Sequence, residues 1–150
     1  MSKTKYTFID LFAGIGGFHQ ALHSVGGHCV FASEWDKNAR LSYEANYKNI
    51  APNLFENNHK YFNSDINDAK PEDIPDFDIC CGGFPCQAFS SAGKRLGFED
   101  TRGTLFFEAA RIIKEKQPFG FLLENVEGLV NHDKERPNAP MGRTLATILQ

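Results

Sequence analysis

The chain has 150 residues, which is enough for one domain with a sizeable core. Of these residues 41% are hydrophobic and 23% are charged, as in globular proteins. The formal net charge of −3 excludes a general basic surface, so a nucleic-acid partner would need a local basic patch or another protein segment. No apolar run is long enough to cross a bilayer and no secretory segment opens the chain, which predicts a cytoplasmic protein that is not secreted and has no membrane partner.

Strands alternate with helices along the predicted chain. The strands are expected at residues 6–12, 29–33, 60–63, 77–81 and 119–123. The helices are expected at residues 18–25, 36–47 and 105–116, with a further one beginning at 141. The alternation predicts an α/β, Rossmann-like fold with a mostly parallel sheet and helices on both faces.

Two of these helices carry a predicted apolar face, and residues 48–58 are expected to form a loop. On the first helix that face comprises Phe18, Ala21, Leu22 and Val25. On the helix at 105–116 it comprises Leu105, Phe106, Ala109, Ile112 and Ile113. Both sets recur at the spacing of one helical face, which predicts that they are buried against the sheet.

A glycine-rich turn follows the first strand, at residues 13–17. Glycines at this place let a ligand approach the backbone closely. Gly14 and Gly16 fit the dinucleotide fingerprint, but His19 stands where its third glycine would be, so the spacing disfavours NAD binding. A nucleotide-binding oxidoreductase is kept as an alternative.

Acidic residues follow the second and third strands. Glu34 is placed to accept hydrogen bonds from ribose hydroxyls, and Trp35 offers a flat face for a purine. Asp65, with Ile66 beside it, would extend the same pocket toward an adenine amino group. The alternatives are a capped helix start with a core tryptophan, and an ordinary turn aspartate.

A cysteine in a glycine-rich segment gives the strongest catalytic signal. Cys86 lies just after the fourth strand and Glu124 ends the fifth, so both are expected at one edge of a parallel sheet. A thiolate and a carboxyl there suit covalent addition combined with proton transfer. An ordinary thiol has a pKa of about 8.5, so a cation such as Arg95 or Arg102 would be needed to favour the thiolate. Without Cys86, Glu124 would be interpreted as an ordinary loop carboxylate.

The other cysteines, Cys29, Cys80 and Cys81, lie in apolar runs and are expected to be small buried residues. Cysteine and histidine spacings match no zinc site, and nothing indicates a disulfide framework, so no metal is expected. Polar and basic residues between 87 and 102 are candidates for phosphate contacts. The pair Lys94 and Arg95 fits a solvated surface equally well.

Taken in order, these segments resemble the catalytic domain of the DNA cytosine-5 methyltransferases over nearly all of the chain. The segments that carry the resemblance are residues 8–17 (the methyl-donor motif), 34–36 and 65–66 (ribose and adenine positions), 83–90 (the nucleophile loop), 97–107 (the segment after it) and 124–126 (the second catalytic motif). One such motif would be weak evidence, whereas the ordered set is specific.

The resemblance implies methyl transfer from S-adenosylmethionine to C5 of cytosine in double-stranded DNA, through a covalent adduct with a flipped base, as in a restriction–modification system. Cys86 would attack C6 of the base, and Glu124 would share a proton with N3. The cofactor-binding residues it implies are Phe12, Ala13, Gly14, Gly16, Gly17, Glu34, Trp35, Asp65, Ile66 and Pro85. The substrate-binding residues it implies are Phe84, Pro85, Gln87, Ser90, Asn125 and Val126. A nucleoid-associated location would fit this activity.

The family normally continues beyond this length. Residues 1–150 are therefore expected to be the N-terminal portion of the catalytic domain, with a fold incomplete at the C-terminus and no target-recognition region. The missing C-terminal region or a second subunit would be a partner, and an exposed apolar edge is expected where it packs. The alternatives are a catalytically incompetent fragment, a subunit that binds S-adenosylmethionine and needs a C-terminal partner, and a related tRNA cytosine-5 methyltransferase.

Overall fold

The computed structural model describes residues 5–84, 105–134, 136 and 138–149. They belong to two compact units. One comprises Met1–Gly83 and Glu108–Leu123, and the other comprises Phe84–Phe107 and Glu124–Gln150.

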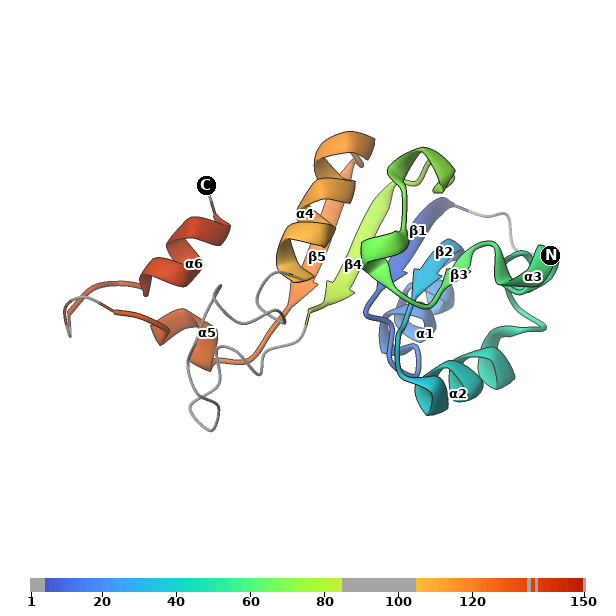
Figure 1. Cartoon of the computed structure of the whole chain (residues 1–150), viewed down its shortest axis with the longest axis horizontal. Coiled ribbons are helices and arrows are strands. Elements are labelled where there is room, and N and C mark those ends of the chain that lie inside the picture. Colours follow the sequence, from blue (N-terminus) through green and yellow to red (C-terminus); the bar gives the residue numbers. More distant parts are fainter. Residues whose placement is uncertain (1–4, 85–104, 135, 137, 150) are drawn as a thin grey trace. The chain divides into compact units, whose positions relative to one another are not determined.

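The first unit is built on a sheet of five strands in the order β3-β2-β1-β4-β5 (Figure 1). The strands are β1 (Tyr6–Leu11), β2 (Gly27–Ser33), β3 (Phe62–Asn63), β4 (Ile79–Gly83) and β5 (Gly120–Glu124). β1 pairs in parallel with β2 and β4, and β2 pairs in parallel with β3. The predicted α/β sheet is confirmed, and its strand order is that of doubly wound folds, which bind ligands beyond the carboxyl ends of their strands.

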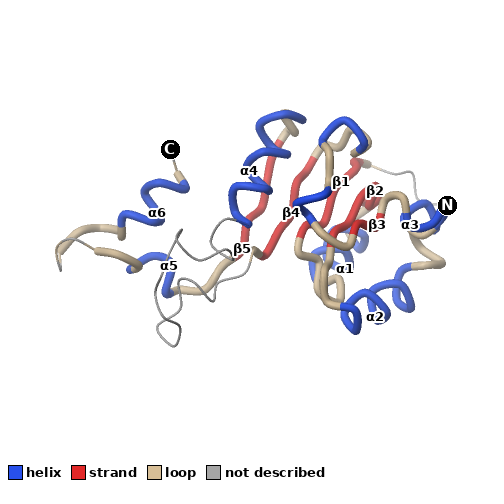
Figure 2. Tube along the Cα trace, viewed as in Figure 1, coloured by secondary structure: helices blue, strands red, loops and turns tan. Residues whose placement is uncertain are grey.

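Helices and short 3-10 turns connect these strands (Figure 2). The helices are α1 (Gly17–Ser24), α2 (Lys37–Tyr47), α3 (Glu56–His59), α4 (Leu105–Lys116), α5 (Gly128–Asn131) and α6 (Arg143–Ile148). The 3-10 turns are η1 (Pro52–Leu54), η2 (Ile66–Asp68) and η3 (Pro71–Asp73). The helix expected from Asp36 onward is confirmed, since the Asp36 carboxylate caps α2 by accepting the Ala39 N–H at 2.8 Å.

β1 is the central strand of the sheet, and four of its six residues are buried. Phe8 and Ile9 are both 0% exposed, and successive side chains of a strand point to opposite faces. The sheet is therefore covered on both faces at its centre, as expected for parallel strands flanked by helices. On the face of Phe8, the core includes Tyr43 and Tyr47 of α2 together with Phe62 of β3.

The predicted apolar face of α1 is only partly confirmed. Leu22 packs against the core and Phe18 is half-buried, but Val25 is 57% exposed and Ala21 is also exposed. His19, which was not predicted to face the core, is fully buried. The histidine can be buried because Nδ1 hydrogen-bonds to the Tyr43 hydroxyl at 2.7 Å and the ring stacks on Tyr47, with centroids 3.9 Å apart. Polar pairing thus decides which side of α1 faces the core.

The predicted face of α4 is confirmed. Phe106, Ala109 and Ile112 are buried, and Leu105 and Ile113 are half-buried. The helix is tied to the segment before β4, where Lys116 donates to the Ile74 carbonyl at 2.8 Å and pairs with the Asp76 carboxylate at 2.7 Å.

Several element boundaries differ from the prediction by one or two residues. β4 extends through Gly82 and Gly83 instead of ending at Cys81, because Gly82 pairs with Leu11 and a side chain there would lie 3.3 Å from the Leu11 carbonyl oxygen. The expected loop at 48–58 contains η1 and most of α3. Within α3, Asn57 and Asn58 have φ of 50° and 59°, a left-handed conformation that asparagine tolerates.

The second unit contains α5 and α6. His132 Nδ1 and Thr144 Oγ1 lie 2.7 Å apart and are both buried, and Arg143 pairs with Asp133 at 2.8 Å. These contacts join the end of α5 to the start of α6.

Large apolar side chains are exposed along and before β5, which ends the strand order. Phe119 is 97% exposed, Phe121 61% and Leu122 51%. The apolar edge expected from the sequence is therefore present, and such patches mark surfaces that another segment or protein covers.

A polar cluster lies inside the core, around Asp10 of β1. Asp10 is 0% exposed, and neither carboxylate oxygen has a hydrogen-bond partner among the described residues. Burial raises the pKa of Asp10 to about 8, although the His19 backbone and the Tyr43 hydroxyl lie near enough to oppose this shift. Burial lowers the pKa of His19 to about 3. Both side chains are therefore neutral in the folded protein at pH 7.

The free energy of unfolding is expected to fall between pH 6.5 and 8. Folded Asp10 keeps its proton up to about pH 8, whereas the unfolded chain releases it near pH 4, so Asp10 lowers stability as pH rises across this interval. Neutral His19 contributes stability that is present above pH 6.5 and is lost as pH falls toward 3. Between about pH 4 and 6.5, the stability lost through Asp10 as pH rises is offset by the stability gained through His19. From pH 6.5 to 8 only Asp10 contributes, and the free energy of unfolding falls by about 2 kcal/mol.

Asp10→Asn should remove this decline, as measured by urea unfolding at pH 6.5 and 8. Asp68→Asn, at an exposed aspartate, is the matched control and should keep it. A decline in Asp10→Asn as steep as in the wild type would contradict the assignment.

Candidate functional site

The glycine-rich turn after β1 has an unusual backbone. Gly14 and Gly16 have φ of 56° and 95°, and Phe12, which is not a glycine, has φ of 56°. The Ala13 N–H donates to the Ser33 carbonyl at 2.9 Å, which fixes the start of the turn against the end of β2. A bulky residue held in the left-handed region costs on the order of 1 kcal/mol, and such strain is concentrated at functional sites.

Tyr47 of α2 holds the far end of this turn. Its hydroxyl donates to the Gly16 carbonyl at 2.6 Å, and a Cβ at Gly16 would lie 2.2 Å from the Tyr47 ring. Gly16 is therefore required both by its φ and by the close approach of the ring. Gly14 and Gly17 are open, with no atom within 4 Å of a Cβ built there.

The Glu34 carboxylate joins this turn to the start of α2. One oxygen accepts the Gly14 N–H at 2.7 Å and the other accepts the Asp36 N–H at 2.8 Å. A carboxylate has about four lone-pair sites, so each oxygen can accept one further hydrogen bond. Glu34 is half-buried at the carboxyl edge of the sheet, where it remains accessible.

The neighbours of Glu34 divide between surface and core. Trp35 is 82% exposed, so the alternative of a core tryptophan is wrong. Asp65 caps η2, with its Oδ1 accepting the Asn67 N–H at 3.0 Å and the Asn67 amide at 2.7 Å, as in an ordinary Asx turn. Ile66 is 4% exposed, which leaves its backbone as the part that can face a ligand.

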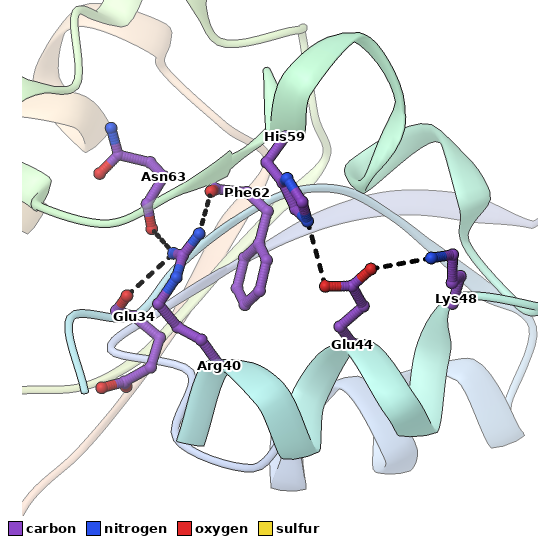
Figure 3. A network of polar contacts seen from close by, with 7 residues as sticks. All are labelled: Glu34, Arg40, Glu44, Lys48, His59, Phe62 and Asn63. Carbon is purple, nitrogen blue, oxygen red and sulfur yellow. Dashed lines mark hydrogen bonds and ion pairs between the residues drawn. The ribbon is translucent and has the colours of Figure 1, made fainter. Parts of the chain in front are cut away.

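Arg40 links the ends of β2 and β3. Its guanidinium donates to the carbonyls of Glu34, Phe62 and Asn63, at 3.0, 3.0 and 2.7 Å (Figure 3). One turn further along α2, Glu44 pairs with Lys48 and His59, at 3.0 and 3.1 Å. Arg40, Tyr43 and Tyr47 thus make α2 the helix that contacts both the glycine-rich turn and the end of β2.

The second unit contains a smaller group around Phe84 and Asn125. The Asn125 amide donates to the Phe84 carbonyl at 3.0 Å, and its oxygen accepts the Val126 N–H at 2.9 Å. Phe84 is 4% exposed and meets Phe106 edge-on, with centroids 5.4 Å apart, whereas Val126 is 38% exposed. Glu124, the last residue of β5, is exposed.

Residues 6–150 match the family of C-5 cytosine-specific DNA methylases. The chain belongs to this family. It is 54% identical over 147 residues to the type II methyltransferase M.HpaII of Haemophilus parainfluenzae, and the matched region covers 98% of this chain and 37% of that protein. It is 53% identical over 149 residues to M.NlaIV of Neisseria lactamica, and here the matched region covers 95% of this chain and 33% of that protein. The chain therefore spans about a third of the length of the curated relatives it matches.

The fold is shared with a solved structure, that of the Dnmt2 methyltransferase of S. pombe. The TM-score is 0.61 at 22% identity, over 97% of this chain and 41% of that one. Membership of the methylase family replaces the alternative of a nucleotide-binding oxidoreductase, which the absence of the third glycine had already disfavoured.

Four of the predicted site residues of this methylase chain, Pro85, Cys86, Gln87 and Ser90, lie outside the described residues. The other three cysteines lie among the described residues, and all three are buried. Burial raises the pKa of Cys80 and Cys81 to about 12, and it raises that of Cys29 well above its ordinary value. These three are therefore protonated at neutral pH and cannot act as thiolate nucleophiles, as expected for buried cysteines.

Sequence reasoning missed the residues of α2 that hold the site. Arg40, Tyr43 and Tyr47 recur at the spacing of one helical face, and that pattern was available in the sequence. Their role depends on the neighbouring carbonyls and the His19 ring, which no pattern in the chain reveals.

Within the described part of the chain, no three His, Cys, Asp or Glu side chains are placed to hold a metal ion. None of the helices described has the length and apolar character needed to span a membrane.

Gly16→Ala is expected to lower the free energy of unfolding by about 2 kcal/mol or more, because its Cβ would overlap the Tyr47 ring. The matched control is Gly17→Ala, one residue later in open space, which should change stability by less than about 0.5 kcal/mol. Thermal unfolding of the two variants distinguishes them. Equal stability of both would contradict the close packing of Tyr47 on the turn.

Proposed function

We propose that this chain is the donor-binding and catalytic part of an enzyme that methylates C5 of cytosine in double-stranded DNA, with S-adenosylmethionine as methyl donor. The observation that supports this most directly is the Glu34 carboxylate, which accepts the Gly14 N–H at the carboxyl edge of the sheet. The curated relatives are named type II methyltransferases, and the family acts on cytosine in DNA.

The donor side fits the adenosine part of S-adenosylmethionine. Glu34 keeps acceptor capacity for two ribose hydroxyls, and exposed Trp35 offers a face on which a purine can stack. Gly14 and Gly17 leave room for close approach to the backbone, and the strained Phe12 lies beside them. Ala13, Gly16, Asp65, Ile66 and Pro85 complete the proposed donor-binding set.

When bound, S-adenosylmethionine supplies the methyl group. The Cys86 thiolate adds to C6 of a flipped cytosine, and Glu124 shares its proton with N3, which offsets the charge that builds on the ring. This makes C5 nucleophilic, and C5 takes the methyl group as the donor's methyl–sulfur bond breaks and the sulfur keeps the electron pair. Loss of the C5 proton then lets the C6–sulfur bond break, which frees Cys86.

The groups around this chemistry have supporting roles in the proposal. Phe84 and Pro85 shape the pocket for the base, and Asn125 holds the segment that begins at Phe84, whose carbonyl it contacts at 3.0 Å. Gln87, Ser90 and Val126 contribute to substrate binding.

The rest of the protein is proposed to complete the enzyme. The curated relatives are about three times as long as this chain. A C-terminal region or a second subunit would cover the apolar side chains exposed around β5 and would supply target recognition. The near-neutral charge of this chain fits a DNA-binding surface that lies mostly elsewhere.

Calorimetric titration of the 150-residue chain with S-adenosylmethionine should show saturable binding. Glu34→Gln is expected to weaken it at least tenfold, on the order of one hydrogen bond to a charged group. The control Glu115→Gln removes an exposed carboxylate of α4 and should bind as the wild type does. Folded wild-type chain that binds no donor would mean that the donor site is wrongly assigned or needs the remaining part of the protein, and a longer chain separates the two.

Cys86→Ser is expected to abolish methyl transfer to DNA, because a hydroxyl at this position is a far weaker nucleophile than a thiolate. Donor binding should be unchanged. The measurement is incorporation of labelled methyl groups into DNA, with calorimetry on the same variant. Methyl transfer at the wild-type rate by Cys86→Ser would refute the proposed nucleophile.

A further inference from the structure

Arg40 contacts the backbone at both places where the sheet presents an acidic residue to the donor site. Its Nη1 donates to the carbonyls of Glu34 and Asn63, and its Nη2 to that of Phe62 (Figure 3). Asn63 ends β3, and Asp65 follows two residues later. The guanidinium therefore lies between the backbone that carries Glu34 and the backbone that leads to Asp65.

Phe62 anchors β3 in the core, but few backbone contacts fix the end of this strand. It has only two residues, and its register with β2 consists of the pairs Ala32–Phe62 and Ser33–Asn63. The Asn63 carbonyl accepts the Glu34 N–H at 3.1 Å and the Arg40 guanidinium at 2.7 Å, so Arg40 reinforces the last link between the strands. A strand this short depends on such contacts for a defined position.

The contacts suit arginine and no other side chain. Three carbonyls are bound by one planar group with donors at fixed angles, and Cζ lies 4.2 Å from the centre of the Phe62 ring. Burial lowers the pKa of Arg40, while Glu34 and Glu44 raise it, and the group stays charged. A lysine would retain the charge but could not reach the same three oxygens with the same geometry.

Every polar group of Glu34 makes a hydrogen bond, and only some lone pairs of its carboxylate remain free. Its N–H is bound by Asn63, its carbonyl by Arg40, and its two carboxylate oxygens by the N–H groups of Gly14 and Asp36. Loss of Arg40 removes the contact to the Glu34 carbonyl and weakens the contact through Asn63. The position of Glu34 would then depend mainly on the two hydrogen bonds of its carboxylate, to the N–H groups of Gly14 and Asp36.

We infer that Arg40 is a positioning residue that sets the distance between Glu34 and Asp65, and thereby the fit of the site to the ribose of the donor. This inference rests on the proposed function. Arg40 acts through Glu34 and does not itself touch the donor.

The test is calorimetric titration of Arg40→Lys with S-adenosylmethionine and with its 2′-deoxy analogue. Arg40→Lys should bind the donor about tenfold more weakly than the wild type does. It should bind the analogue, which lacks one of the two hydroxyls that Glu34 is proposed to bind, less than about threefold more weakly. The double variant Arg40→Lys/Glu34→Gln should bind no more weakly than Glu34→Gln alone, because residues that act through one contact are not additive. Without ligand, hydrogen exchange at the Glu34 amide should be faster in Arg40→Lys.

Lys37→Met is the control for charge, since it removes an exposed cation from the first turn of the same helix. The inference is overturned if Arg40→Lys binds the donor as the wild type does, if donor and analogue are weakened equally, or if Lys37→Met has the same effect. Should Arg40→Lys not fold, Arg40→Gln is measured in its place, and unfolding of both variants would show that Arg40 serves the fold and not the site. If neither the wild-type chain nor a longer chain binds the donor, the proposed function is refuted, a result that differs from all of these.

Discussion

The hydrogen bond between the Glu34 carboxylate and the Gly14 N–H, 2.7 Å long, is the contact on which the site depends. It joins the turn after β1 to the end of β2, two segments that a parallel sheet brings together only at its carboxyl edge. The other contacts extend from this bond. Asp36 fixes the second carboxylate oxygen and caps α2, and α2 in turn holds Gly16 through Tyr47 and the Glu34 carbonyl through Arg40.

This arrangement requires polar groups inside the core. Tyr47 hydrogen-bonds to the Gly16 carbonyl, and its ring stacks on the His19 ring. His19 hydrogen-bonds to Tyr43, which lies beside Asp10 of the central strand. Burial of a polar side chain costs less when the side chain is neutral, and both His19 and Asp10 are neutral at pH 7. His19 is also paired with Tyr43, whereas the Asp10 carboxyl has no hydrogen-bond partner among the described residues. The glycine-rich turn therefore rests on neutral polar residues of the core, while Gly14 and Gly17 remain open.

Regular patterns in the sequence predicted most of the fold. The apolar run of β1, the period of α4 and the cap at Asp36 each follow from local chemistry, and the structure agrees with them. Prediction failed where distant partners decide. His19 is buried because Tyr43 and Tyr47 face it, and β4 runs through two glycines because Leu11 pairs with one of them.

In the candidate site, too, local patterns allowed prediction and distant partners did not. The glycines of the turn, Glu34 and Trp35 could be chosen from residue type and position at strand ends. Arg40 could not, because its three acceptors are backbone carbonyls, which every residue carries. Glu34 contacts the turn and Trp35 is exposed, but the pocket that they would form stays a prediction. The catalytic roles of Cys86 and Glu124 rest on the family resemblance and on chemistry.

An NMR titration of the ¹⁵N-labelled chain with S-adenosylmethionine tests whether the turn held by Glu34 forms the donor site. The largest amide shifts are expected at Gly14, Gly17 and Glu34, together with a shift of the Trp35 indole N–H. Saturable shifts that leave these four groups unchanged, for example shifts confined to the apolar residues around β5, would contradict this assignment.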